Sequence, residues 1–157
     1  MKRLALALAF TLPSAATADD RFTDTLQRCL AGAADRNHVP PEVLILLYQN
    51  EGGALGRISR NTNGTVDIGP FQINQIWLPA LSSHWSLPQP LVYHLLLNQL
   101  CANAEAAAWI LRTNLDAAHG DLWEAVGRYH SADPVLKTGY LRQIYAHLMA
   151  LIRRTNG

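Results

Sequence analysis

The chain of 157 residues lacks clusters of basic residues, and its charge is almost balanced. It has 13 Lys and Arg residues against 12 Asp and Glu residues, so its formal net charge is +1. Binding to nucleic acid or to an anionic membrane surface requires clustered Lys and Arg. We therefore expect neither nucleic acid nor a charged lipid surface as a partner.

Cysteine is also scarce, and Cys29 and Cys101 are the only two. Two cysteines without clustered His or Asp do not supply the ligands of a zinc site, and we expect no metal or cofactor. In an oxidising compartment an isolated pair favours a disulfide, with two buried free thiols as the alternative. The bridge would close a loop of about 72 residues (101 − 29) and stabilise the fold by roughly 4 kcal/mol at most.

No apolar run is long enough to span a bilayer, which needs about 20 residues. The longest early run covers residues 4–12, follows Lys2 and Arg3, and precedes an Ala-Thr-Ala exit that ends at Ala18. This pattern is typical of a secretory signal peptide, here residues 1–18, and an uncleaved anchor is the alternative. No cysteine stands at the cleavage point to make a lipoprotein.

Cleavage would leave residues 19–157, about 139 residues (157 − 18), with a net charge of −1 (11 − 12). That length suits one domain with one core, and no repeat or low-complexity linker indicates a second. We expect an exported, periplasmic domain without a stable membrane span after processing.

The remaining pattern predicts a mostly α fold with a small polar loop or β-hairpin after a central helix. Apolar residues from Phe22 to Ala33 recur at three- and four-residue steps, which is typical of an amphipathic helix. The next helix, from Pro41, is apolar almost all round and should be buried. Gly52 and Gly53 should end it.

Residues 53–67 are polar and contain an Asn-Gly turn, which favours a hairpin or an irregular loop. Helical patterning then resumes in several segments. It covers residues 71–77, the segment after Pro88 and Pro90, and residues 98–118, 122–130 and 134–153. In the last helix, one face should carry Tyr140, Ile144, Tyr145, Leu148 and Leu151.

Glu51 is the first candidate for chemistry because it stands at the end of the buried helix. A carboxyl group in a poorly solvated cleft has a raised pKa, and at about 6 or 7 it can donate a proton near neutral pH. Taken alone, a Glu at a helix end is more often a solvated surface residue.

The surrounding motifs resemble those of the lysozyme-like lytic transglycosylases, especially the small exported members associated with type III and type IV secretion and conjugation. Glu51 matches the Glu of the family's Glu-Ser pair. Residues 69–74, Gly-Pro-Phe-Gln-Ile-Asn, match its Gly-Leu-Met-Gln-Ile-Asn segment. Tyr129 matches the Tyr of its Ala-Tyr-Asn element. The likeness extends to an Asn-containing helix at residues 98–111 and to the tryptophans Trp77, Trp109 and Trp123.

The resemblance implies a lysozyme-like domain that cleaves peptidoglycan glycan strands, with Glu51 as acid and then base. The sugar's own C6 hydroxyl would close a 1,6-anhydro ring, so no second carboxylate is needed. By resemblance, Gln72 and Tyr129 flank the acid, Phe71 forms an apolar wall, and Asn74 belongs to the substrate-binding set. Tyr129 is equally compatible with a core position, and His130 with a sugar contact or a solvated position.

Asp67 leaves a second mechanism open. It follows Glu51 by 16 residues (67 − 51), within a stretch that also resembles the polar hairpin of animal-type lysozymes. If both carboxyl groups face the cleft about 5 to 5.5 Å apart, a retaining hydrolase is possible. The alternative is a hairpin residue that bonds nearby backbone.

Five positions depart from the family pattern. Pro70 and Phe71 replace Leu and Met and keep the apolar character of that segment. Gly52 replaces Ser, while Arg128 and His130 replace Ala and Asn and would add polar groups near the sugars. These changes keep open a further interpretation, a peptidoglycan-binding protein without turnover that works as an assembly factor. The expected partners are glycan strands and components of a secretion or conjugation apparatus.

Overall fold

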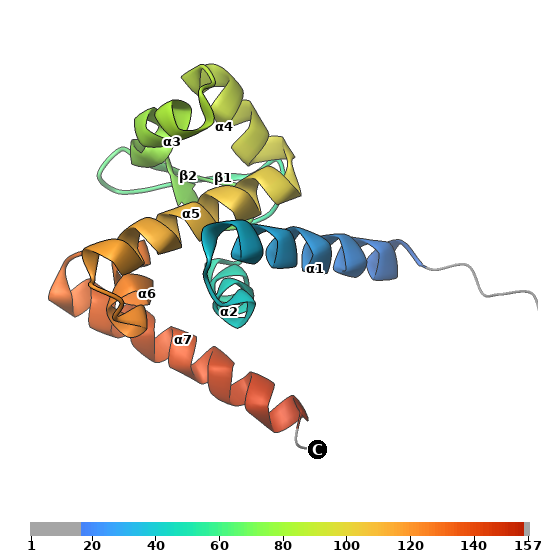
Figure 1. Cartoon of the computed structure of the whole chain (residues 1–157), viewed down its shortest axis with the longest axis vertical. Coiled ribbons are helices and arrows are strands. Elements are labelled where there is room, and N and C mark those ends of the chain that lie inside the picture. The colour runs from blue at the N-terminus through green and yellow to red at the C-terminus, as the bar shows by residue number, and fades with distance from the viewer. Residues whose placement is uncertain (1–16, 156–157) are drawn as a thin grey trace, which may run out of the picture.

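The computed structural model describes residues 17–155, which form seven α-helices and a small antiparallel sheet (Figure 1). In chain order the elements are α1 Ala18–Asn37, α2 Pro41–Glu51, β1 Ile58–Arg60, β2 Val66–Ile68, β3 Ile73–Asn74, a 3-10 helix Gln75–Trp77, α3 Leu78–Trp85, α4 Gln89–Asn98, α5 Leu100–Ala117, α6 Leu122–His130 and α7 Pro134–Thr155. The predicted mostly α fold with a hairpin after the central helix is confirmed. Most of the expected signal peptide, residues 1–16, lies outside the described part.

Helix α5 is the centre of the core, with α1 packed along it and α6 against its C-terminal part (Figure 1). Ala104, Ala106, Ala107 and Ala108 are completely buried, and their small side chains allow neighbouring helices to approach closely. The predicted disulfide joins α1 to the first turn of α5, where the Cα atoms of Cys29 and Cys101 lie 4.7 Å apart.

Helix α2 begins and ends where the sequence predicts. Pro41 is its first residue, and Gly52 ends it in the left-handed conformation, with φ of +60°. The helix is buried along most of its length, including Leu44 and Leu47 at 0% exposure. These boundaries place Glu51 on the last turn of a buried helix, at the point where the chain leaves for the hairpin.

The polar segment after α2 forms the predicted hairpin. β1 pairs with β2 in the register Ser59 to Asp67, and β2 pairs in turn with β3. The turn is closed by a bond from the Gly64 N–H to the Asn61 carbonyl, and Gly64 adopts φ of +83°. A left-handed residue after such a turn is common in short hairpins, so the Asn-Gly signal was informative.

The predicted helix over residues 71–77 is wrong. Gly69 and Gln72 adopt φ of +71° and +48°, which is incompatible with a continuous right-handed helix. The chain instead makes a tight turn, forms β3, and then a 3-10 helix that Asn74 caps by accepting the Ile76 N–H. Apolar spacing alone could not distinguish these short elements from one helical turn.

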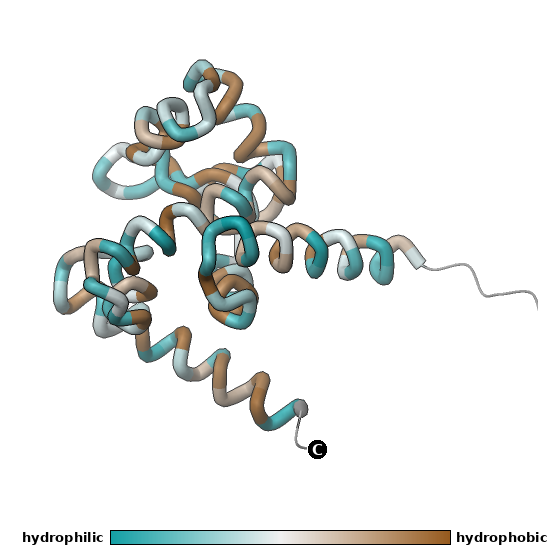
Figure 2. Tube along the Cα trace, viewed as in Figure 1, coloured by the Kyte–Doolittle hydropathy of each residue, from teal (hydrophilic) through white to brown (hydrophobic). Residues whose placement is uncertain are grey.

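Two residues of the predicted apolar helix faces are not buried. Phe22 is 44% exposed because the N-terminal half of α1 extends beyond the helices that cover its other half, and Tyr145 of α7 is 57% exposed. Figure 2 shows polar and apolar segments alternating along α7, which matches its one buried stripe through Tyr140 and Ile144. Within residues 17–155, no helix combines the length and apolar character needed to cross a bilayer.

Candidate active site

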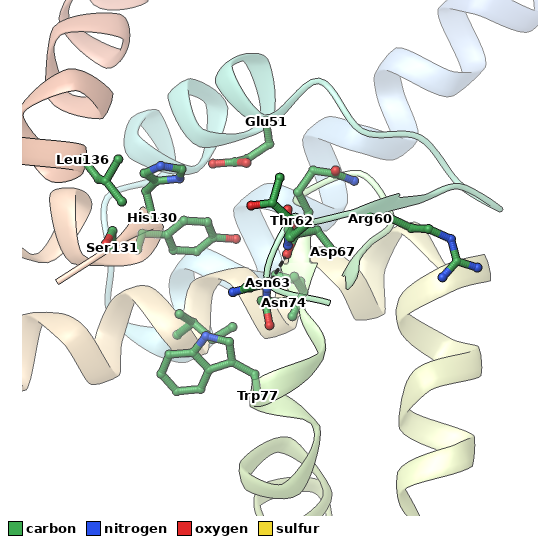
Figure 3. Close-up of a pocket in the computed structure, with 15 residues that line it drawn as sticks. Glu51, Arg60, Thr62, Asn63, Asp67, Asn74, Trp77, His130, Ser131 and Leu136 are labelled. Carbon is green, nitrogen blue, oxygen red and sulfur yellow. Dashed lines mark hydrogen bonds between the residues drawn. The ribbon is translucent and has the colours of Figure 1, made fainter. Parts of the chain in front are cut away.

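A cleft of about 550 Å³ opens between the hairpin and the junction of α6 with α7. Its lining comprises Glu51, Arg60, Asn61, Thr62, Asn63, Asp67, Gln72, Ile73, Asn74, Trp77, Ile110, Tyr129, His130, Ser131 and Leu136. Figure 3 shows Glu51 between the hairpin residues on one side and His130, Ser131 and Leu136 on the other. Its size lies within the range of ligand-binding clefts, and its lining combines polar and apolar groups.

Glu51 has the properties of a general acid. Burial raises the pKa of its carboxyl group to about 7, a nearby hydrogen bond from Tyr140 opposes the shift, and the charge of Asp67 adds to it. Desolvation is therefore the main cause, because a carboxylate loses more hydration than the neutral acid. A pKa near neutrality allows the group both to donate and to accept a proton at neutral pH, as general acid and base catalysis requires.

Tyr140 belongs to the site through its contact with Glu51, although its sequence pattern predicted only a position on an apolar helix face. Its side chain is 4% exposed, and its hydroxyl donates a 2.6 Å hydrogen bond to Oε1 of Glu51. Burial, the charge of Glu51 and this bond raise the pKa of the phenol well above its usual value. Tyr140 thus remains a neutral donor that fixes one oxygen of the acid.

Tyr129, which the resemblance places beside the acid, lines the cleft but bonds elsewhere. Its hydroxyl donates to the carbonyl of Phe71 at 3.1 Å, so its proton is not directed at Glu51. Burial is the first cause of the raised pKa of this phenol, followed by the charges of Glu51 and Asp67. The structure therefore gives Tyr129 the position of a neutral wall and Tyr140 the contact with the acid.

His130 lines the cleft and lies parallel to Tyr140, with ring centroids 4.8 Å apart and an interplanar angle of 1°. Its exposed ring covers the phenol that holds Glu51. Of the two roles open for His130, its position at the cleft surface is compatible with a sugar contact.

Asp67 faces the same cleft and is held by side-chain amides rather than by backbone. Asn61 donates to its Oδ2 at 2.9 Å, and Asn74 donates to its Oδ1 at 2.7 Å. Asn74 also donates to the hydroxyl of Thr65, which links β3 to the turn that precedes β2. The carboxylate is thus oriented by both of its oxygens, and Asn74 serves as support for Asp67 as well as lining the cleft.

Gln72 lies where α2 approaches the turn after β2. Its Nε2 donates to the carbonyl of Gly69 at 2.8 Å, and its side chain lines the cleft. The approach is so close that a Cβ on Gly53 would lie 2.1 Å from the Gly69 carbonyl oxygen and 2.7 Å from Nε2 of Gln72. Only glycine at residue 53 allows the end of α2 to contact this turn.

The prediction that Phe71 forms a wall of the cleft is wrong, because its side chain is completely buried and does not line the cleft. Its ring packs against that of Tyr48, with ring centroids 5.6 Å apart. Its backbone connects α5 to α6 through two hydrogen bonds. The Phe71 N–H donates to Oδ1 of Asn103 at 2.8 Å, while its carbonyl accepts from Tyr129. The apolar floor of the cleft comes instead from Ile73 and Ile110.

Asn103 is a second residue whose role at the site the sequence did not predict. It is completely buried on α5, and its Nδ2 donates to the carbonyls of Ile68 and Leu96 at 3.0 and 2.8 Å. One amide therefore satisfies two carbonyls and the Phe71 N–H at the turn that carries Gln72. The family-like Asn segment was the only signal for it in the sequence.

The departures from the family pattern have different consequences. Gly52 has room for a Cβ, but its positive φ is strained for serine, so glycine suits this helix end. The expectation that Arg128 adds a polar group near the sugars is wrong. Its exposed side chain binds Glu124 at 2.8 Å and does not line the cleft.

The three expected tryptophans separate into different environments. Trp77 lines the cleft and meets Trp109 edge to face at 6.0 Å, whereas Trp123 is 46% exposed and lies outside the cleft lining. A flat indole at the cleft wall offers a surface on which a sugar ring can pack.

Comparison with models of known protein families and with curated protein sequences finds no match to this chain. Among the residues that the structure describes, no group of three His, Cys, Asp or Glu side chains is placed to hold a metal ion.

Proposed function

We propose that this protein is a peptidoglycan lytic transglycosylase that cleaves the β-1,4 bond between N-acetylmuramic acid and N-acetylglucosamine. The observation that carries the proposal is the state of Glu51: a largely buried carboxyl group with a pKa of about 7, at the wall of an open polar cleft. The ordered motifs around residues 51, 69–74 and 129 support the same family.

In the proposed reaction Glu51 first protonates the glycosidic oxygen, and the bond to C1 of the muramic sugar breaks. The ionised Glu51 then takes the proton of the C6 hydroxyl, whose oxygen bonds to C1 and closes the 1,6-anhydro ring. The acid is restored and no water is consumed. Tyr140 holds Oε1 throughout, and no hydrogen bond from the described residues occupies Oε2, which leaves that oxygen for the proton transfers.

The biological setting is part of the proposal. A signal peptide would deliver the domain to the periplasm, where the glycan strands lie. Local cleavage there would open the wall for a transenvelope secretion or conjugation apparatus, as the resemblance to small exported transglycosylases implies.

Hydrolysis is the second candidate, and the amide-held carboxylate of Asp67 in the same cleft favours it. An oriented carboxylate could stabilise or attack the sugar cation, after which water would complete the reaction. The two candidates share Glu51 as the acid and differ in the nucleophile.

Product analysis distinguishes the candidates. We expect mass spectrometry of purified peptidoglycan digested by this protein to show fragments with 1,6-anhydromuramic ends. Fragments with reducing ends and one added water would instead support the hydrolase and make Asp67 the next residue to replace. Intact strands despite measurable binding would favour an assembly factor without turnover.

Replacing Tyr140 with phenylalanine should alter the acid without removing it. The lost hydrogen bond stabilises the ionised form, so the pKa of Glu51 should rise further. We expect the fall of kcat/KM on the alkaline side to move to higher pH, and the rate at neutral pH to drop about tenfold as the acid loses its orientation.

The matched control is Tyr145→Phe, since Tyr145 is an exposed tyrosine on the same helix. It should leave the pH profile unchanged. An unshifted profile in Tyr140→Phe would contradict the positioning role.

A further inference from the structure

The outer edge of the hairpin has unpaired backbone groups beside the cleft. The Gly69 N–H donates to the Arg57 carbonyl, and the Asn61 N–H donates to the Thr65 carbonyl. Since bonded and non-bonded pairs alternate along an antiparallel ladder, Ser59 also faces β2. The N–H and C=O groups of Ile58 and Arg60 therefore point away from β2, toward an edge that no described strand covers.

This edge is exposed and continuous with the cleft. All three residues of β1 are exposed, and Arg60 at its end is part of the cleft lining. An uncovered edge strand is a ready template for another extended chain. Here that chain would lie along the rim of the cleft.

Arg60 supplies charge at the same place. It is the only Lys or Arg among the lining residues that the structure describes, and it takes part in none of the ion pairs found between residues 17 and 155. Figure 3 shows its guanidinium pointing away from Glu51, so it does not neutralise the acid. An unpaired guanidinium at a rim suits a carboxylate, which it can bind with two parallel hydrogen bonds.

We propose that the β1 edge and Arg60 together bind the peptide stem that peptidoglycan carries on its muramic acid residues. The inference rests on the proposed function and names a second part of the substrate. A stem is a short peptide with free carboxylates, attached beside the bond to be cleaved. In extended form three of its residues span roughly 10 Å, about the length of β1. Its backbone pairs with Ile58 and Arg60, and a stem carboxylate binds the guanidinium.

Charge complementarity favours this occupant over the bare glycan. The acids of the cleft, Glu51 and Asp67, would repel a stem carboxylate placed between them, whereas the rim at Arg60 attracts it. Glycan hydroxyl groups, in contrast, need neither a cation nor a strand edge. The enzyme therefore selects strands that still carry their peptides.

The test measures binding of strand fragments to the Glu51→Gln protein, which separates recognition from turnover. One sample carries peptide stems, and the other has had them removed by an amidase. We expect the strands with stems to bind about fivefold to tenfold more tightly by calorimetry. Arg60→Gln should bring the ratio close to one, and Ile58→Pro should lower it by removing an outward N–H without breaking the ladder.

Arg57→Gln is the matched control, because it removes the same charge from an exposed residue that does not line the cleft. It should retain the preference for stems. Equal affinity for the two samples, or a preference that survives both Arg60→Gln and Ile58→Pro, would overturn the inference. A stem preference without any cleavage by the unmodified chain would support the inference and refute the proposed transglycosylase.

Discussion

Replacing Glu51 with glutamine is expected to slow cleavage of glycan strands by about a thousandfold or more. The amide keeps the size of the side chain and can still accept the hydrogen bond of Tyr140. It cannot donate a proton to the glycosidic oxygen or take one from the C6 hydroxyl, so the loss falls on the chemical step. The measurement is the initial rate at which soluble fragments leave purified peptidoglycan.

Glu42→Gln is the control for this variant, because Glu42 is an exposed carboxylate in the first turn of the same helix. It should cleave at the rate of the unmodified protein. Equal rates for Glu51→Gln and the unmodified chain would remove Glu51 from the chemistry. Equal rates would then favour a protein that binds glycan strands without cleaving them.

The same variant has a second readout that does not depend on substrate. The pKa of Glu51 is about 7 in the folded chain against a reference of 4.5. Between these values the folded chain holds a proton that the unfolded chain has released, so stability falls as pH rises through this window. The shift of 2.5 (7 − 4.5) corresponds to about 3 kcal/mol at most. Glu51→Gln avoids this loss, and urea unfolding should find it more stable at pH 8 but not at pH 4.

Local signals were sufficient for much of the fold and for the acid itself. Pro41 and the Gly52-Gly53 pair mark the ends of α2 by backbone chemistry that acts within a few residues, so the position of Glu51 could be predicted. The Asn-Gly turn and the pair of cysteines are similar cases. In each, one or two residue types have a strong conformational or chemical preference.

Contacts between distant segments could not be predicted in the same way. Tyr140 bonds Glu51 across 89 residues, and its spacing on α7 indicated only a buried face. The resemblance placed Phe71 at the cleft wall, yet its side chain is completely buried in the core. Apolar periodicity reports that a side chain is buried and says nothing about which partner its polar end meets.

The turn between β2 and β3 depends on a single buried amide, and replacing Asn103 with leucine should therefore be severe. Leucine fills similar volume but leaves the Phe71 N–H unpaired in the core and removes the amide that donates to the carbonyls of Ile68 and Leu96. Each unpaired buried group costs about 1–3 kcal/mol. We expect the free energy of unfolding to fall by about 3–6 kcal/mol in urea unfolding.

Asn114→Leu provides the control on the same helix. Among the described residues, the buried Nδ2 of Asn114 finds no hydrogen-bond partner, so its removal should cost less than about 1 kcal/mol. A similar loss in both variants would mean that leucine on α5 is poorly accommodated in general. A small loss in Asn103→Leu would mean that the turn satisfies its own backbone.

Asn103→Leu should also lower the activity of the molecules that remain folded. The amide holds the backbone of Phe71, whose carbonyl fixes Tyr129 and whose neighbour Gln72 lines the cleft. Under conditions in which the variant is still folded, these two cleft residues lose their anchored positions. We therefore expect kcat/KM to fall at least tenfold in the folded fraction, because a displacement of about 1 Å at the walls disturbs the alignment of substrate with Glu51. Full activity in that fraction would show that Asn103 supports the fold and not the geometry of the cleft.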